Sequence, residues 1–166
     1  MMPAATEDLV RELDQLAAAA ASAEDLMTLI VGRLQERLPH YDWVGFYMVE
    51  TGKLPGQEDI LVLGPYVGAP TPHTRIPLDQ GICGAAVSAG ATIVVDDVHS
   101  DPRYLACSLE TKSEIVVPIR VRGKIVGELD IDSHQPAAFT AEDRALVEHC
   151  AGLVGRFLEK DSDQHV

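Results

Sequence analysis

The sequence has few basic residues. Thirteen lysines and arginines stand against 26 aspartates and glutamates, which gives a formal net charge of −13 at pH 7. Binding to the phosphate backbone of nucleic acids needs clustered lysine and arginine side chains, and attraction to anionic membranes also needs positive charge. The charge balance therefore argues against a nucleic acid or a membrane surface as partner.

Long apolar runs and a secretion signal are also missing. No stretch approaches the roughly 20 apolar residues that span a bilayer, and the N-terminus has no basic segment followed by an apolar core. We therefore expect a cytoplasmic protein. No linker rich in proline, glycine and serine divides the chain, so residues 1–166 are expected to form a single domain.

Cysteine is scarce, and the number of cysteines is odd. Cys83, Cys107 and Cys150 lack the close-paired spacing of zinc sites, and a disulfide between them in the cytoplasm is expected to be transient and catalytic, or absent. A zinc site from two histidines and two cysteines is conceivable, because imidazole and thiolate suit zinc. Nothing in the spacing supports it, so no metal is predicted. The residues concerned are His73, Cys83, His99 and Cys107.

Helical periodicity begins the chain. Residues 7–21 have leucines and alanines at helical spacing, with Thr6 as the expected N-cap. A second helix is expected to start at Ser22, in a capping-box pattern, and to stop before Pro39. We therefore predict N-terminal helices within residues 6–38.

A further helix is predicted to close the chain over residues 141–158. It follows a capping-box pattern at Thr140 to Asp143, and Cys150 in its middle is expected to serve as packing. The polar tail 161–166 is expected to fray.

A period of two marks the middle of the chain as strands and pocket, residues 41–133. Segment 67–80, which includes His73, is predicted as a loop with little repeating structure, and 81–91 as a short helix. Strands are predicted at 41–48, 59–66, 92–95, 113–121 and 124–132. These elements predict an α+β fold with a central antiparallel sheet, helices packed on one face and ligand-pocket loops on the other.

The most informative stretch is residues 104–132, which begins near Cys107 and ends in a run of carboxylates. In its last strand, Val126, Glu128, Asp130 and Asp132 alternate with an apolar set and are predicted to share one face. Such a face is either an exposed acidic edge or a pocket wall, and spacing alone does not decide. The face of residues 43, 45 and 47 is a second candidate to line a pocket.

Cys83 lies near the start of the predicted short helix. A thiolate there would be stabilised by the partial positive charge of the helix N-terminus, which would make Cys83 a reactive thiol. The alternative is a small buried apolar residue. Composition alone leaves both open.

Eight ordered motifs between residues 42 and 143 resemble a GAF domain of the free methionine-(R)-sulfoxide reductase family. They are Asp-Trp43-Val-Gly-Phe-Tyr47, Leu-Val-Leu-Gly-Pro-Tyr66, Arg75-Ile-Pro, Gly81-Ile-Cys83-Gly84, Asp97-Val-His99, Ala106-Cys107, Ser113-Glu114-Ile-Val-Val-Pro118 and Leu129-Asp-Ile-Asp-Ser133. This resemblance implies a GAF fold, commonly dimeric, and reduction of free methionine (R)-sulfoxide without a metal or organic cofactor. It also implies a thioredoxin-like electron donor.

The resemblance also assigns roles to residues. Cys107 matches the nucleophile, which would attack the sulfoxide sulfur and become a sulfenic acid. Glu114, Asp130 and Asp132 match carboxylates around the substrate, and Trp43 and Tyr47 match its aromatic wall. We expect Glu114 to donate the proton, because neighbouring carboxylates raise its pKa, and the remaining carboxylates to bind the substrate ammonium group.

One position departs from the family pattern. His73 stands where the family usually has the cysteine that resolves the oxidised nucleophile. Cys83 then takes over as resolving thiol, or an external thiol reduces Cys107 directly, or the domain binds a methionine-like ligand without turnover. We hypothesise that His73 pairs with Cys107 and favours its thiolate.

Overall fold

The protein is an α+β structure built on one six-stranded antiparallel sheet. The computed structural model describes residues 4–105 and 109–164. The strand order is β3-β2-β1-β6-β5-β4, and every neighbouring pair is antiparallel. The strands are β1 (Trp43–Glu50), β2 (Ile60–Val67), β3 (Arg75–Pro77), β4 (Ile93–Val95), β5 (Ser113–Val121) and β6 (Lys124–Ser133).

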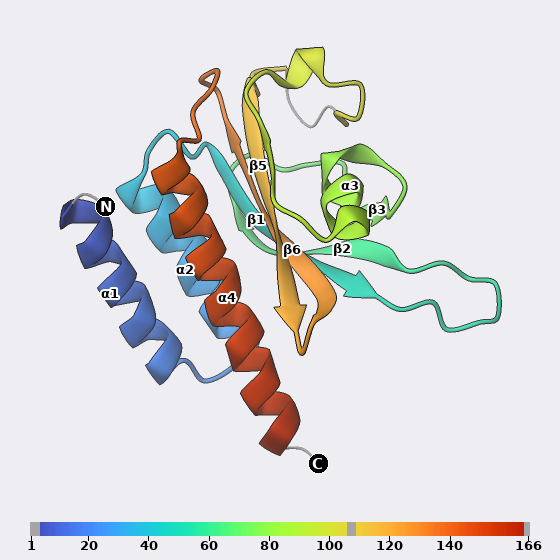
Figure 1. Ribbon diagram of the computed structural model, residues 1–166, viewed down its shortest axis with the longest axis horizontal. Helices are drawn as coiled ribbons and strands as arrows, with labels where there is room; N and C mark the ends of the chain where they lie inside the picture. The colour runs from blue at the N-terminus through green and yellow to red at the C-terminus, as the bar shows by residue number, and fades with distance from the viewer. Residues whose placement is uncertain (1–3, 106–108, 165–166) are drawn as a thin grey trace.

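Three long helices cover one face of the sheet (Figure 1). They are α1 (Ala4–Ala19), α2 (Ala23–Arg37) and α4 (Ala141–Gln164). Helices α2 and α4 pack on the sheet, and α1 packs mainly on α4 and α2. The apolar core lies between these helices and the alternate residues of β1 and β6 that include Phe46, Leu129 and Ile131.

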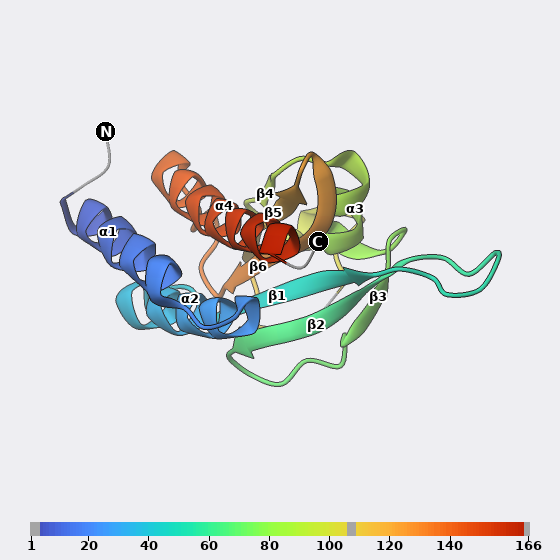
Figure 2. The same cartoon turned by 90° about the horizontal axis from the view of Figure 1, so that it is seen from below.

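The opposite face holds a shorter helix, α3 (Gly81–Ala89), and a 3-10 turn, η1 (Val98–Ser100). Figure 2 shows α3 separated from the three long helices by the sheet. A second, smaller apolar cluster lies here and includes Trp43, Tyr47, Ile76, Cys83 and Val116. The predicted division of the sheet into a helix face and a pocket face is confirmed, with a helix added to the expected pocket loops.

Helix boundaries mostly follow the capping signals. Ser22 caps α2 by accepting a hydrogen bond from the Asp25 amide at 3.1 Å. Thr140 and Asp143 bond reciprocally before α4, with the Thr140 amide donating to Asp143 at 2.8 Å. Thr6 is not an N-cap, because α1 already begins at Ala4.

Two other expectations about element boundaries were wrong. Helix α4 extends to Gln164 rather than to residue 158, so residues 161–164 of the predicted frayed tail are helical. Segment 67–80 contains β3, whose three residues pair with β2. So short a strand has too few residues to show a period.

The β5–β6 hairpin turns at Arg122 and Gly123, as predicted. Both residues have positive φ values, 51° and 80°, which two-residue hairpin turns of the primed type require. The ladder is interrupted nearby, because Ile119 pairs with Gly127 while Arg120 pairs with Ile125. This irregularity places Val126 against the helix-side core rather than on the carboxylate face, where it was predicted.

Candidate functional site

The carboxylates of β6 form a buried wall, not an exposed acidic edge. Glu128 is 0% exposed, and Asp130 and Asp132 are each 3% exposed. Glu114 on β5 is 5% exposed and is the direct cross-strand partner of Asp132. The question that spacing left open is therefore settled by burial.

The two pocket faces predicted from the strand pattern lie side by side. In the β1–β6 ladder, Trp43 pairs with Asp132, Gly45 with Asp130, and Tyr47 with Glu128. Paired residues on adjacent strands point to the same side of a sheet. The aromatic and acidic residues therefore share one surface, beneath α3.

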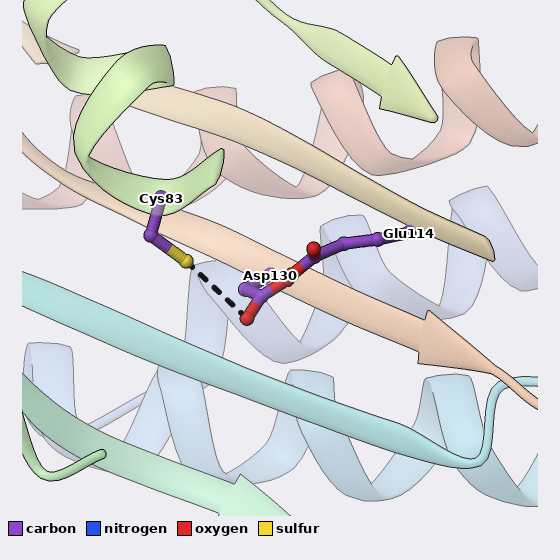
Figure 3. A group of neighbouring side chains, drawn as sticks. All are labelled: Cys83, Glu114 and Asp130. Atoms are coloured by element: carbon purple, nitrogen blue, oxygen red, sulfur yellow. Dashed lines mark hydrogen bonds between the residues drawn. The ribbon is translucent and has the colours of Figure 1, made fainter. Parts of the chain in front are cut away.

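Helix α3 places Cys83 over this surface. The Cys83 thiol donates a hydrogen bond to Oδ2 of Asp130, with a sulfur–oxygen distance of 3.4 Å (Figure 3). Gly84 permits the close approach of α3 to the preceding segment, because a Cβ there would lie 2.7 Å from the Leu78 carbonyl oxygen. A small cavity of about 10 Å³ remains beside the thiol. Its lining is Tyr47, Ile76, Gly81, Ile82, Cys83, Leu105, Glu114 and Asp130.

Burial sets the protonation of the carboxyl groups. It is the largest cause that raises the pKa of Glu114 well above its ordinary range, and the charges of Asp130 and Asp132 add to it. Burial also raises the pKa of Asp130, Asp132 and Glu128. The predicted upward shift at Glu114 is thus present, although desolvation contributes more to it than the neighbouring carboxylates do.

The same surroundings act against a thiolate at Cys83. Burial raises its pKa well above the usual thiol value, and the charges of Asp130, Glu128 and Glu114 raise it further. Of the two alternatives that the sequence left open for Cys83, the described structure favours the buried residue over a thiolate stabilised by the helix N-terminus, because burial and three acidic neighbours raise the pKa of the thiol.

An aromatic stack forms the side of the site. The ring of Trp43 stacks between those of Tyr47 and Tyr66, at centroid distances of 6.1 and 5.6 Å, and its indole N–H donates to the Ala69 carbonyl at 3.1 Å. A Cβ at Gly45 would overlap Cη2 of the Trp43 ring and lie 2.6 Å from its Cζ3, so the indole can cross β1 only over a glycine.

The segment that includes His73 is tied to this stack. The Tyr47 hydroxyl donates to the His73 carbonyl oxygen at 2.7 Å, and the His73 amide donates to Oγ1 of Thr71 at 3.1 Å. The His73 side chain is half-buried. Cys107 lies outside the described residues, so its role as nucleophile and its pairing with His73 stay predictions.

Glu128, which was predicted to share a strand face with Asp130 and Asp132, is buried on the pocket face with them. One residue of the site was not predicted. Tyr66 completes the stack on Trp43, and no local pattern connects the two positions, since the contact depends on the pairing of β1 with β2.

One group of described side chains has the geometry to hold a metal ion, although no metal was predicted. Ligand atoms of Cys83, Glu114 and Asp130 all lie within 4.8 Å of one another. The group shares only Cys83 with the histidine and cysteine set considered from the sequence. Cys150, on α4, is buried in the helix-side core, as expected for packing.

Comparisons with known proteins identify the family of this chain. The family model of the GAF domain matches residues 22–158. The free methionine-R-sulfoxide reductase of Escherichia coli is 38% identical over 136 residues, which cover 82% of this chain and 78% of the relative.

Solved structures give the same result. The free methionine-R-sulfoxide reductase from Neisseria meningitidis, in complex with its substrate, superposes with a TM-score of 0.87 at 33% identity, covering 97% of this chain and 92% of its own. The type II free methionine-R-sulfoxide reductase from Thermoplasma acidophilum superposes with a TM-score of 0.76 at 41% identity, covering 83% of this chain and 93% of its own. The chain therefore belongs to the free methionine-R-sulfoxide reductase family of GAF domains.

Proposed function

We propose that this protein is an oxidoreductase that reduces free L-methionine (R)-sulfoxide to methionine with Cys107 as nucleophile. The observation that supports this most is the buried set of Glu114, Asp130 and Asp132 beneath an aromatic stack. Buried carboxyl groups of like charge are stable only when they hold protons or face a cation. A free amino acid brings such a cation in its α-ammonium group, which a peptide-bound methionine lacks.

The proposed chemistry divides the acidic residues into two roles. Asp130 and Asp132 accept hydrogen bonds from the substrate ammonium group, and the aromatic rings of Trp43 and Tyr47 pack against its methyl-sulfinyl end. Glu114, whose pKa is raised well above its ordinary value by burial and by the neighbouring carboxylates, is the proton donor.

The Cys107 thiolate attacks the sulfoxide sulfur and forms a sulfur–sulfur bond, while Glu114 protonates the sulfoxide oxygen. The S–O bond of the substrate then breaks, the oxygen passes as hydroxide to the Cys107 sulfur, and the sulfur–sulfur bond breaks. Methionine leaves with the electron pair of that bond, and Cys107 is oxidised to a sulfenic acid. A second thiol then displaces water from the sulfenic acid and forms a disulfide. An external dithiol of the thioredoxin type restores both cysteines.

The resolving thiol is either Cys83 or the external reductant itself. The raised pKa of Cys83 makes it a slow nucleophile at neutral pH. Single-turnover oxidation followed by peptide mass mapping distinguishes the two routes, because only the first produces a disulfide between Cys83 and Cys107. His73 is proposed to favour the Cys107 thiolate, and an unchanged thiol pKa in His73→Ala would contradict this role.

A second candidate function is a non-catalytic GAF module that binds a methionine-like ligand. The substitution of His73 at the usual resolving position favours it. Incubation with free methionine (R)-sulfoxide and dithiothreitol, or a thioredoxin system, separates the two. Methionine release that disappears in Cys107→Ser supports the enzyme, whereas binding without release supports the module.

We further propose that the reaction needs no metal or organic cofactor, and that the protein works as a cytoplasmic homodimer in the repair of oxidative damage. Cys83 and Cys150 are free thiols, which suits a reducing compartment. No helix in residues 4–105 and 109–164 is long and apolar enough to cross a membrane. Light scattering coupled to size-exclusion chromatography tests the oligomeric state.

A further inference from the structure

We propose that Cys83, Glu114 and Asp130 form a binding site for a thiophilic divalent cation, with Zn²⁺ as the representative ion. The three side chains come from α3, β5 and β6 and converge on one point (Figure 3). Their ligand atoms lie within 4.8 Å of one another, and all three residues are buried.

The second observation is a buried carboxylate oxygen of this group that lacks a hydrogen-bond partner. Oδ1 of Asp130 is buried, and no described group donates a hydrogen bond to it. Buried acceptors without donors are costly, and a cation satisfies them.

The ligand chemistry selects the ion. Mg²⁺ and Ca²⁺ prefer sites made only of oxygen, whereas a thiolate together with carboxylates suits Zn²⁺. In a tetrahedral zinc site with ordinary Zn–S and Zn–O bonds, a sulfur and an oxygen ligand lie about 3.6 Å apart. Sγ of Cys83 and Oδ2 of Asp130 are 3.4 Å apart, so this edge of the site already has the required length.

The fourth ligand is a water molecule. The cavity of about 10 Å³ beside the Cys83 thiol is about the size that one water molecule needs, and this water completes four-coordination. The ion would be enclosed in protein, as in structural zinc sites.

Proton release distinguishes this site from ordinary acidic surface. Exposed carboxylates are already ionised at neutral pH, so a cation that binds them displaces few protons. A cysteine binds a metal ion as its thiolate, and a thiol is largely protonated at neutral pH. The ion must therefore displace the proton of the Cys83 thiol when it coordinates the sulfur.

Occupancy of this site has a consequence that rests on the proposed function. Glu114 and Asp130 would then serve either the ion or the substrate, so Zn²⁺ would inhibit sulfoxide reduction competitively. Metal binding itself is measured without substrate. The proposed metal site and the proposed reductase activity can therefore be contradicted independently of each other.

The test uses the full chain with Cys107→Ser, fully reduced, so that Cys107 contributes no ligand. Calorimetric titration with ZnCl₂ in two buffers of different protonation enthalpy gives the stoichiometry and the number of protons released. We expect one ion per chain and at least one proton released per ion. Titration with Co²⁺ should give a thiolate-to-cobalt charge-transfer band.

Matched variants locate the site. Cys83→Ser and Asp130→Asn should each weaken Zn²⁺ binding at least about tenfold, as loss of a metal-site group does. Cys150→Ala, at the other buried thiol, and Glu142→Gln, at an exposed acid, should leave affinity unchanged. Circular dichroism checks that each variant is folded.

Three results would overturn the proposal. The first is the absence of Zn²⁺ binding. The second is binding that releases no proton and gives no cobalt charge-transfer band. The third is an affinity for Zn²⁺ in folded Cys83→Ser and Asp130→Asn that equals the affinity of the parent chain. If Cys83→Ser does not fold, Asp130→Asn and the proton count of the Cys107→Ser chain decide the question.

Discussion

Glu114 on β5 and Asp132 on β6 are direct cross-strand partners, and both side chains are buried on the pocket face of the sheet. Like charges directly opposite one another destabilise a sheet. The pair is therefore stable only when a proton is shared across it or when a cation lies between its members. The proposed reaction uses this property, because the substrate ammonium group supplies the cation and Glu114 supplies the proton.

Replacing Asp132 by asparagine should change how stability depends on pH. The pKa of Asp132 is raised in the folded state, first by burial and then by the charge of Asp130. The folded protein therefore holds a proton that the unfolded chain releases above its ordinary pKa of about 4, and stability falls as pH rises from there towards the folded pKa. Asp132→Asn removes this loss.

We expect Asp132→Asn to unfold at a higher temperature than the parent at pH 8, with a gain in unfolding free energy on the order of 1 kcal/mol or more, and a smaller gain at pH 5. Thermal unfolding at both pH values measures this. Glu142→Gln, at an exposed carboxylate, is the control. Equal gains at the two pH values would contradict a buried protonated Asp132.

Glu114→Gln should abolish most turnover while leaving the shape of the side chain in place. Glutamine cannot donate the proton that the departing oxygen needs, and loss of a general acid typically reduces kcat by about 10²- to 10⁴-fold. In the parent, kcat should fall as pH rises through the elevated pKa of Glu114. If kcat of Glu114→Gln still fell with rising pH in the same way, a group other than Glu114 would be the proton donor.

Cys83 should react slowly with iodoacetamide at neutral pH in the folded protein. Burial raises its pKa, and the charge of Asp130 is the next largest cause. In a Cys107→Ser background, Asp130→Asn should therefore accelerate alkylation of Cys83 severalfold, because reactivity follows the thiolate fraction. Peptide mapping by mass spectrometry gives the rate at each cysteine.

Cys150 provides the internal control for this measurement. Its pKa is raised to about 12, by burial first and then by Asp14, and no carboxylate of the pocket contributes. Asp130→Asn should leave its rate unchanged. Equal acceleration at both cysteines would mean that the variant had loosened the whole fold instead of removing one charge.

Gly45→Ala should displace the aromatic wall. The added methyl group would overlap Cη2 of Trp43 and lie 2.6 Å from Cζ3 of that ring and 2.9 Å from Cβ of Tyr66. Such overpacking typically costs about 1–3 kcal/mol. Trp43 is the only tryptophan, so its fluorescence reports the displacement directly. The KM for free methionine (R)-sulfoxide should rise with it.

Gly32→Ala is the matched control. Gly32 lies within α2, where an added methyl group meets no atom within 4 Å. Alanine in a helix interior is favoured over glycine by roughly 0.5–1 kcal/mol, so this variant should be slightly more stable, with unchanged fluorescence. An unchanged Trp43 fluorescence spectrum in Gly45→Ala would show that the position of the indole does not depend on a glycine at residue 45.

The sequence alone was enough to predict the elements whose signals are local. Capping residues predicted the starts of α2 and α4, and the Arg122–Gly123 turn predicted the β5–β6 hairpin. The alternation of Asp130 and Asp132 with Leu129 and Ile131 predicted which residues share a face. Each of these signals lies within a few residues of the feature that it specifies.

Only the tertiary structure decided what those faces do. Whether Asp130 is solvated or buried depends on α3, which lies far away in the sequence and covers it with Cys83. The short strand β3 forms because β2 offers it an edge, and Val126 leaves the carboxylate face through an irregularity in the ladder. Burial removes water from four carboxyl groups at once, and this shifts their pKa values. The acidic strand of the sequence is thereby buried as one wall of the pocket, where its carboxyl groups have raised pKa values.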